Sequence, residues 1–211
     1  MTMDTIDRYI KDNSSPLPPA LEWLERQTHL RTNHSRMLSG NHVGALLRHI
    51  TLMLAPSRVL ELGVFTGYSS ICIASALRDG AILDAIEIND ELEDLIREGY
   101  GRAGVGGRIN LLIGDARKIV PGLDAEYDLV YIDANKREYA EYYQMIVGKV
   151  RSGGYIIADN VLWDGKVCLD NPPDDAQTHG ISDFNSMVAD DPRVENFILP
   201  LRDGLNIIRK K

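Results

Sequence analysis

The amino-acid sequence predicts an α/β fold, a mainly parallel sheet with helices on both faces. After residue 56, short and nearly continuous apolar runs alternate with amphipathic helical stretches. Such runs are typical of parallel strands that helices bury on both sides. The last two runs are joined by the tight link Arg202-Asp203-Gly204, which predicts an antiparallel hairpin at the end of the sheet.

Length and charge limit the class of protein. The chain has 211 residues, with 31 Asp and Glu against 23 Lys and Arg and a net charge of −8. This length suits one domain with a full core, and the acid excess argues against a nucleic-acid partner. No apolar run approaches the roughly 20 residues that span a bilayer, the N-terminus lacks a signal pattern, and two cysteines are too few for a disulfide framework. We therefore expect a single cytoplasmic domain without a membrane segment.

The first 55 residues are predicted to be helical. Apolar and small residues recur there at helical spacing, at Leu17, Leu21, Leu24 and Thr28. Asn41 is a candidate cap for the next helix, and Pro56 ends it. We expect residues 1–55 to form a helical cover and residues 56–211 to form the core that contains the sheet.

The core contains seven strand-like runs: Ser57–Leu62, Ala81–Glu87, Ile109–Ile113, Tyr127–Asp133, Tyr155–Asp159, Val194–Leu199 and Leu205–Ile208. An apolar stripe from Tyr139 to Val150 predicts a helix that ends before Gly153. A polar loop, Leu162–His179, and a helix around Asp183–Val188 follow the fifth run. The sheet is therefore predicted to have seven strands.

The loop after the first strand predicts a nucleoside site. It reads ELGVFTGYSS from Glu61 to Ser70, and a glycine turn between a strand and a helix lets a ligand approach backbone N–H groups. Glu87 ends the second strand about 20 residues later, where an acid can bind both ribose hydroxyls. The alternative is that Gly63 and Gly67 only close a tight turn and Glu87 caps a helix.

The spacing of this loop favours one cofactor over another. Dinucleotide folds show G-x-G-x-x-G around a pyrophosphate, whereas here Gly63 and Gly67 are four apart and Glu61 precedes them. A carboxylate would repel a pyrophosphate and would suit the ammonium of a methionine group, which favours S-adenosylmethionine over NAD. Asp115 follows the third strand and could meet the adenine amino group.

Acidic side chains also end the fourth and fifth strands. Asp133 ends one, and Asp159 and Asn160 end the other. Neighbouring parallel strands lie about 4.8 Å apart, and two carboxylates that close are stabilised by a cation between them. These oxygen ligands predict Mg²⁺ or Ca²⁺, and no Cys/His set has zinc spacing. The alternative is a helix cap at Asp133 and a turn at Asp159.

Lys136 follows the fourth strand and is predicted to reach the same edge. A nearby divalent cation favours the neutral form of a lysine, which can then take a proton from a hydroxyl. The alternative is a solvated surface lysine at a helix start.

These motifs together resemble the cation-dependent O-methyltransferases, the family that contains the catechol and caffeoyl-CoA enzymes. The resemblance covers essentially the whole chain, in the motifs Met37-Leu-Ser39, Glu61-Leu-Gly-Val-Phe-Thr-Gly-Tyr-Ser69, Glu87, Asp133-Ala-Asn-Lys136, Asp159-Asn-Val-Leu-Trp163 and Leu199-Pro-Leu-Arg-Asp-Gly-Leu205. It implies a Rossmann-like methyltransferase fold, S-adenosylmethionine and Mg²⁺ (or Ca²⁺ or Mn²⁺) as cofactors, a small catechol-like phenol as acceptor, and a homodimer.

The resemblance also implies roles for individual residues. The methionine end of the cofactor would be held by Ser39, Glu61, Gly63, Val64 and Ser69. Glu87 would hold the ribose, Asp115 and Ala116 would flank the adenine, and Asn135 would lie beside the cofactor. Asp133, Asp159 and Asn160 would ligate the metal. Lys136 would deprotonate the acceptor, with Asp133 beside it in the catalytic pair.

Three positions depart from the family's usual pattern, namely Val43, Asn135 and Asp164. Two other functions stay open from the residues alone. An NAD-dependent oxidoreductase would share the strand–glycine–helix pattern but lacks the three-glycine spacing, and a non-catalytic protein could bind S-adenosylmethionine without transferring its methyl group.

Overall fold

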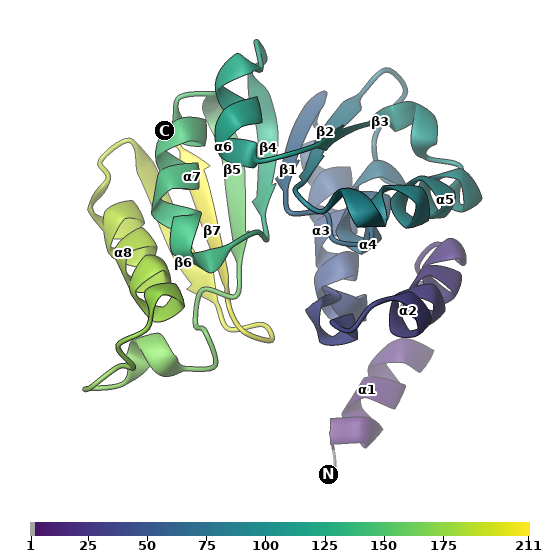
Figure 1. Cartoon of the computed structure of the whole chain (residues 1–211), viewed down its shortest axis with the longest axis horizontal. Helices are drawn as coiled ribbons and strands as arrows, with labels where there is room; N and C mark the ends of the chain where they lie inside the picture. Colours follow the sequence, from purple (N-terminus) through teal and green to yellow (C-terminus); the bar gives the residue numbers. More distant parts are fainter. Residues whose placement is uncertain (1–2) are drawn as a thin grey trace.

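The computed structural model describes residues 3–211, which form one seven-stranded sheet between two layers of helices (Figure 1). The helices are α1 (Met3–Asp12), α2 (Ala20–Arg31), α3 (Gly40–Leu54), α4 (Tyr68–Ala74), α5 (Glu93–Ala103), α6 (Ala116–Ile119), α7 (Tyr139–Val147) and α8 (Ala176–Asp190). The strands are β1 (Arg58–Leu62), β2 (Ile82–Glu87), β3 (Ile109–Ile113), β4 (Tyr127–Ile132), β5 (Val150–Asp159), β6 (Val194–Leu199) and β7 (Leu205–Lys210). No helix among these residues is long and apolar enough to cross a membrane.

The strand order is β3-β2-β1-β4-β5-β7-β6. Strands β1 to β5 are parallel, and β7 runs antiparallel to both β5 and β6. This confirms the predicted mainly parallel sheet with a closing hairpin. The chain leaves β1 in one direction across the sheet and returns to β4 on its other side, and in open α/β sheets ligands bind at such a reversal, beyond the carboxyl ends of the strands.

Alternate residues of each strand face different helical layers. Val59 packs in the cluster that α2 to α5 complete, whereas Leu60 packs in the cluster of α7 and α8. Side chains of a strand point to opposite faces in turn, so a strand that is apolar at every position requires cover on both sides. Figure 1 shows α3, α4 and α5 on one side of the sheet and α6, α7 and α8 on the other.

Two predicted element boundaries were wrong by a few residues. Helix α3 begins at Gly40 with Ser39 at its N-cap, so Asn41 lies inside the first turn. Val150 belongs to β5 and pairs with Tyr127 of β4, so it is not the end of the preceding helix. The strand partner, which lies outside any local pattern, decides this boundary.

The predicted polar loop is also shorter than expected, because α8 begins before His179. The carboxylate of Asp175 accepts hydrogen bonds from the backbone N–H groups of Gln177 and Thr178, both 3.0 Å away. An aspartate that bonds to the free N–H groups of the first turn caps a helix. The loop after β5 therefore ends at Asp175.

Candidate active site

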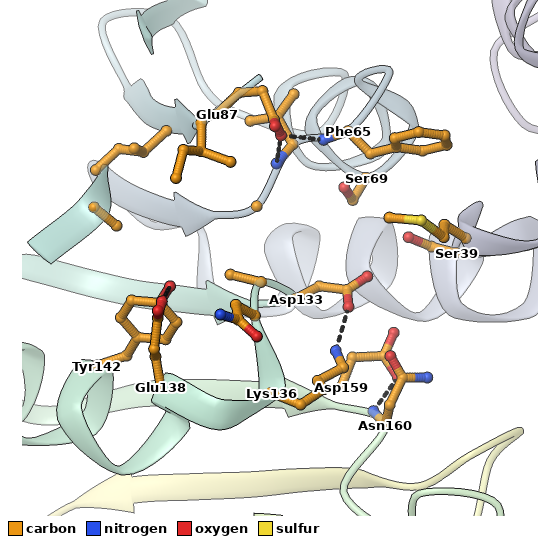
Figure 2. Close-up of a pocket in the computed structure, with 18 of the residues that line it drawn as sticks. Ser39, Phe65, Ser69, Glu87, Asp133, Lys136, Glu138, Tyr142, Asp159 and Asn160 are labelled. Atoms are coloured by element: carbon orange, nitrogen blue, oxygen red, sulfur yellow. Dashed lines mark hydrogen bonds and ion pairs between the residues drawn. The ribbon is translucent and has the colours of Figure 1, made fainter. Parts of the chain in front are cut away.

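A cavity of about 590 Å³ lies at the carboxyl ends of the central strands (Figure 2). All but one of the predicted site residues line it: Ser39, Gly63, Val64, Ser69, Glu87, Asp115, Ala116, Asp133, Asn135, Lys136, Asp159 and Asn160. In Figure 2, Ser39 and Ser69 lie toward the right end of this cavity and Glu138 and Tyr142 lie at its left end. The remaining predicted residue, Glu61, does not line the cavity.

The glycine loop is shaped by close packing against the chain that follows β4. Gly63 has φ of +89°, and a Cβ built on it would lie 2.2 Å from the carbonyl oxygen of Asp133. Only glycine tolerates both the conformation and the contact. Across the loop, the Glu87 carboxylate accepts hydrogen bonds from the N–H groups of Val64 (3.0 Å) and Phe65 (2.6 Å). Glu87 therefore fixes the loop in addition to facing the cavity.

Glu61 is fully buried beneath this loop. Its carboxylate accepts hydrogen bonds from the hydroxyls of Ser69 and Ser70. Burial raises the pKa of Glu61 to about 7, an effect that the two serine bonds oppose only in part. Ser69 stands between Glu61 and the cavity, so a direct contact of Glu61 with a cofactor stays a prediction.

The three predicted metal ligands come together from neighbouring strands. Asp133 follows β4, and Asp159 and Asn160 follow β5, which pairs with β4 in parallel. Asp159 is 3% exposed and accepts a hydrogen bond of 2.8 Å from the hydroxyl of Tyr131. Burial, and then the charge of Asp133, raise the pKa of Asp159 to about 6.

This set fits a hard divalent cation. Two carboxylates and an amide supply oxygen ligands, and a cation would relieve the repulsion that raises the pKa of Asp159. Among the described residues no group of three His, Cys, Asp or Glu side chains is placed to hold a metal. A cation here would therefore need Asn160 and further oxygens from water or substrate.

Lys136 lies inside the site, which excludes the alternative of a solvated surface lysine. Its side chain is 10% exposed. Its Nζ donates to Oδ1 of Asp133 at 2.8 Å and to the hydroxyl of Tyr139 at 2.6 Å. The Tyr139 hydroxyl in turn donates to the carbonyl of Asp159 at 2.9 Å. The tyrosine thus links the lysine to the end of β5.

The segment around Ser39 that borders the cavity is held by Arg202, a residue distant in sequence that was not predicted as a site residue. Arg202, in the link between β6 and β7, donates from Nη1 to the carbonyl of Leu38 at 3.1 Å and to that of Ser39. Both Arg202 and Ser39 line the cavity. The Leu199–Leu205 motif pointed to this link, but no spacing rule connects it to residue 38.

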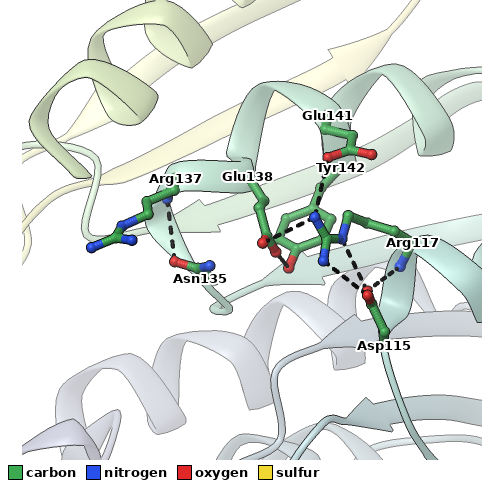
Figure 3. Close-up of polar contacts among 7 residues, drawn as sticks. All are labelled: Asp115, Arg117, Asn135, Arg137, Glu138, Glu141 and Tyr142. Atoms are coloured by element: carbon green, nitrogen blue, oxygen red, sulfur yellow. Dashed lines mark hydrogen bonds and ion pairs between the residues drawn. The ribbon is translucent and has the colours of Figure 1, made fainter. Parts of the chain in front are cut away.

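Glu138 and Tyr142 were also missed. Both line the cavity, and the Tyr142 hydroxyl donates to Oε2 of Glu138. Glu138 lies two residues after Lys136, so its proximity to the site could have been read from the sequence. Tyr142 lies in the predicted apolar stripe and is 4% exposed, so it is buried and also borders the cavity beside Glu138 (Figure 3).

Comparison with known proteins identifies the family of this chain. The model of the O-methyltransferase family matches residues 11–211. Caffeoyl-CoA O-methyltransferase 2 of Zea mays is 33% identical over 224 residues, which cover 98% of this chain and 83% of the relative.

Two solved structures have the same fold. One is an O-methyltransferase of Streptomyces achromogenes involved in tomaymycin synthesis, in complex with S-adenosylmethionine; it has a TM-score of 0.91 and 27% identity and covers 98% of this chain and 96% of its own. The other is a methyltransferase of Podospora anserina with S-adenosylhomocysteine bound, with a TM-score of 0.89, 29% identity and coverage of 100% and 97%. The chain therefore belongs to the O-methyltransferase family of the caffeoyl-CoA type, a family of class I S-adenosylmethionine-dependent enzymes.

Proposed function

We propose that this enzyme transfers the methyl group of S-adenosylmethionine to a hydroxyl of a small catechol-like phenol, with the help of a divalent cation. The observation that carries the proposal is the meeting of Lys136 with Asp133, Asp159 and Asn160 in one cavity. The membership of the family removes the NAD-dependent alternative.

S-adenosylmethionine and the divalent cation would occupy different parts of the cavity. Ser39 and Ser69, at the right end of the cavity in Figure 2, would face the methionine end of S-adenosylmethionine, and Glu87 would face the ribose. Asp115 and Ala116 would flank the adenine, and Asn135 would lie beside the cofactor. Ser39, which belongs to the N-terminal residues 1–55, lines this cavity. This supports the proposal that residues 1–55 act as a helical cover of a single domain.

Asp133, Asp159 and Asn160 would hold Mg²⁺, or Ca²⁺ or Mn²⁺ in its place. Bound there, the cation would supply Lewis-acid chemistry that makes an acceptor hydroxyl more acidic. A vicinal diol suits such a site, because its two oxygens can approach the same cation. Similarity to a caffeoyl-CoA O-methyltransferase of Zea mays and to a tricin synthase of Oryza sativa supports a phenolic acceptor.

In this proposal Lys136 is the general base. Asp133 and Tyr139 hold its Nζ in place, and Nζ takes the proton of the acceptor hydroxyl. The oxygen then forms a bond to the methyl carbon while the bond from that carbon to sulfur breaks, which leaves S-adenosylhomocysteine. The remaining work of the site is alignment of the two reactants.

One assay tests both parts of the proposal. The protein is incubated with S-adenosylmethionine and a panel of catechols, with Mg²⁺ or with EDTA, and a mass gain of one methyl group is followed by mass spectrometry. We expect transfer with Mg²⁺ and none with EDTA. Transfer that continues unchanged in EDTA would remove the metal role of Asp133, Asp159 and Asn160.

In the same assay, Lys136→Ala should lower turnover by about 10²- to 10⁴-fold, the usual contribution of a general base. Binding of S-adenosylhomocysteine should change little. Lys149→Ala is the matched control, since Lys149 is absent from the cavity lining and donates to the carbonyl of Leu123, which is also absent from it. Equal loss of turnover and of S-adenosylhomocysteine affinity in Lys136→Ala would remove the lysine from the catalytic role.

We also propose that two copies associate through β6. This strand ends the sheet, and its four central residues are exposed. Phe197 is 58% exposed and lines a shallow groove of about 270 Å³ together with Tyr155 and Ile207. An exposed strand at a sheet edge with an apolar groove is suited to association with a second chain.

A further inference from the structure

A chain of three asparagine side chains connects the edge of the sheet with the loop that follows β5. Nδ2 of Asn196 in β6 donates to Oδ1 of Asn206 in β7 at 2.9 Å. Nδ2 of Asn206 donates to Oδ1 of Asn185 in α8 over a long 3.5 Å, and Nδ2 of Asn185 donates to the carbonyl of Val161 at 2.9 Å. The chain of amides therefore ends one residue after Asn160, a proposed metal ligand.

The bond to Val161 determines the orientation of all three amides. A backbone carbonyl only accepts hydrogen bonds, so it selects Nδ2 of Asn185 and leaves Oδ1 facing Asn206. That oxygen needs a donor, so Asn206 turns Nδ2 toward it and keeps its own Oδ1 for Asn196. Each amide then has one orientation that satisfies its neighbours, and Asn185 is held on both sides.

Asn206 is fully buried between apolar neighbours in the sheet. Its partners on the adjacent strands are Ala158 of β5 and Ile198 of β6. A buried amide costs free energy unless it is hydrogen-bonded. Its two bonds lead to β6 and to α8, so the amide serves the contact between these two elements.

The residue that precedes Val161 has an unusual backbone. Asn160 has φ of +59°, in the left-handed region that residues other than glycine seldom adopt and that asparagine tolerates well. Its N–H donates to Oδ1 of Asp159 at 2.7 Å (Figure 2), and Asp159 pairs with Leu205 of β7. The side chain of Asn160 lines the cavity. Its direction depends on how firmly the chain is held on each side of this residue.

Val161 is the fixed point on the far side of Asn160. Its side chain is fully buried, and its N–H donates to the carbonyl of Gly204 at 3.1 Å. Its own carbonyl accepts from Asn185. Because this last bond comes from a side chain, a substitution in α8 removes it and leaves the backbone pairing of β5 and β7 intact.

We propose that Asn185 is a positioning residue for the metal site, which fixes the carbonyl of Val161 and thereby keeps the amide oxygen of Asn160 directed at the cation. The inference rests on the proposed role of Asn160 as a metal ligand. Asn206 acts on the site through Asn185. Groups that orient a metal ligand without touching the metal commonly change metal affinity by about 10- to 100-fold.

A fixed ligand matters more for a small cation than for a large one. Mg²⁺ requires nearly ideal octahedral geometry, whereas Ca²⁺ accepts oxygen ligands at longer and more variable distances. Release of Asn160 should therefore weaken Mg²⁺ binding more than Ca²⁺ binding. General damage to the site would weaken the binding of both cations alike.

Electron paramagnetic resonance of free Mn²⁺ tests the proposal on the whole protein with saturating S-adenosylhomocysteine. Mg²⁺ and Ca²⁺ are added as competitors, which gives a dissociation constant for each cation. We expect Asn185→Leu to weaken Mn²⁺ and Mg²⁺ binding by about 10-fold and Ca²⁺ binding by less than about 3-fold. Asn206→Leu should cause smaller losses in the same order. Asn185 is absent from the cavity lining, so S-adenosylhomocysteine affinity, measured by calorimetry, should stay within about twofold.

Gln144→Leu is the matched control. It also removes an amide that contacts α8, since Nε2 of Gln144 donates to Sδ of Met187 at 3.6 Å, but neither residue lines the cavity. This variant should bind all three cations as the wild-type protein does. Thermal unfolding followed by circular dichroism gives the folded fraction of each variant, so that each dissociation constant refers to folded protein.

Three results would overturn the proposal. Wild-type affinity of Asn185→Leu for all three cations would show that the bond to Val161 does not position Asn160. Equal losses of Mg²⁺ and Ca²⁺ affinity, or the same losses in Gln144→Leu, would reduce Asn185 to general support of α8. A wild-type protein that binds no Mn²⁺ would contradict the proposed metal site and the inference with it. This last result appears before any substitution is made, so the two failures are distinguishable.

Discussion

Glu61, in β1 beneath the glycine loop, shows how the burial of one residue makes stability depend on pH. Its carboxyl group has no exposed surface and bonds to Ser69 and Ser70. Burial disfavours the charged form, which raises its pKa from the ordinary value of 4.5 to about 7. Between these two pH values the folded state holds a proton that the unfolded state releases.

This difference sets the sign of the pH dependence. The folded state binds this proton more tightly than the unfolded state. The resulting contribution to folding stability is fully present below pH 4.5 and is lost as the pH rises through 7. In the free protein, Glu61→Gln removes the titration. We expect the variant to melt several degrees above the wild-type protein at pH 8 and close to it at pH 5, a difference on the order of 3 kcal/mol at most.

Thermal unfolding followed by circular dichroism from pH 5 to 8 measures this effect. Glu91→Gln, which removes an exposed carboxylate, is the control and should leave the wild-type curve unchanged. Parallel curves for wild-type and Glu61→Gln would show that Glu61 is ionised at neutral pH in the folded protein.

At the scale of elements, the position of Lys136 depends on helix α8. A Cβ on Gly180 of this helix would lie 2.5 Å from the carbonyl oxygen of Lys136 and 2.8 Å from the Cα of Arg137. Both atoms belong to the backbone, so neither can rotate away. Glycine at this position lets α8 pack directly on the turn that carries the lysine.

Gly180→Ala should therefore displace Lys136 while leaving the glycine loop in place. We expect turnover to fall by about 10- to 100-fold, since a displacement near 1 Å has effects of this size. The affinity for S-adenosylhomocysteine should stay within about twofold, and stability should fall by about 1–3 kcal/mol. Steady-state kinetics and calorimetry measure these quantities.

Gly148→Ala is the control, because a Cβ there meets nothing within 4 Å. Gly148 also has an ordinary helical backbone, with φ of −69°. A Gly180→Ala enzyme with wild-type turnover would show that the base tolerates a shift of its backbone, or that Lys136 is not the base.

The elements also show which predictions a sequence can support. Strands that are buried on both faces carry a nearly continuous apolar run, and β4 was predicted to within one residue. The meeting of Asp133 and Asp159 followed because carboxyl ends of adjacent parallel strands share an edge. Val150 was misassigned, because its pairing with Tyr127 is non-local and outweighs a helical spacing.

Residues of the site that were missed depend on contacts without a local pattern. Glu138 lines the cavity and faces Arg117, which comes from α6, a different helix on the same side of the sheet. Arg202 reaches the carbonyl of Leu38 from 164 residues away. Spacing rules describe neighbours on one helix or one strand, so they are silent on such pairs.

At the scale of the whole molecule, the proposed dimer follows from the exposed edge of the sheet. Phe197 projects from β6 at 58% exposure. Phe197→Glu would place a charge in the proposed interface, where burial without a partner is costly. We expect light scattering at micromolar concentration to report a dimer for the wild-type protein and a monomer for this variant.

The control is Leu169→Glu, which changes another exposed apolar residue, in the loop after β5 and outside the groove at β6. It should leave the mass unchanged. A wild-type protein that is already monomeric at these concentrations, or a Phe197→Glu variant of unchanged dimeric mass, would contradict association through β6.

The position of β7 in the sheet has a consequence for folding during synthesis. It lies between β5 and β6 although it follows both along the chain. While the ribosome is still adding β6, the free edge of β5 has no partner on that side, and unpaired edges are prone to aggregate. The strand that carries Asp159 therefore gains its second neighbour only when residues 205–210 emerge. A ribosome that pauses before them would leave an incomplete sheet with an exposed, aggregation-prone edge, which chaperones would need to bind.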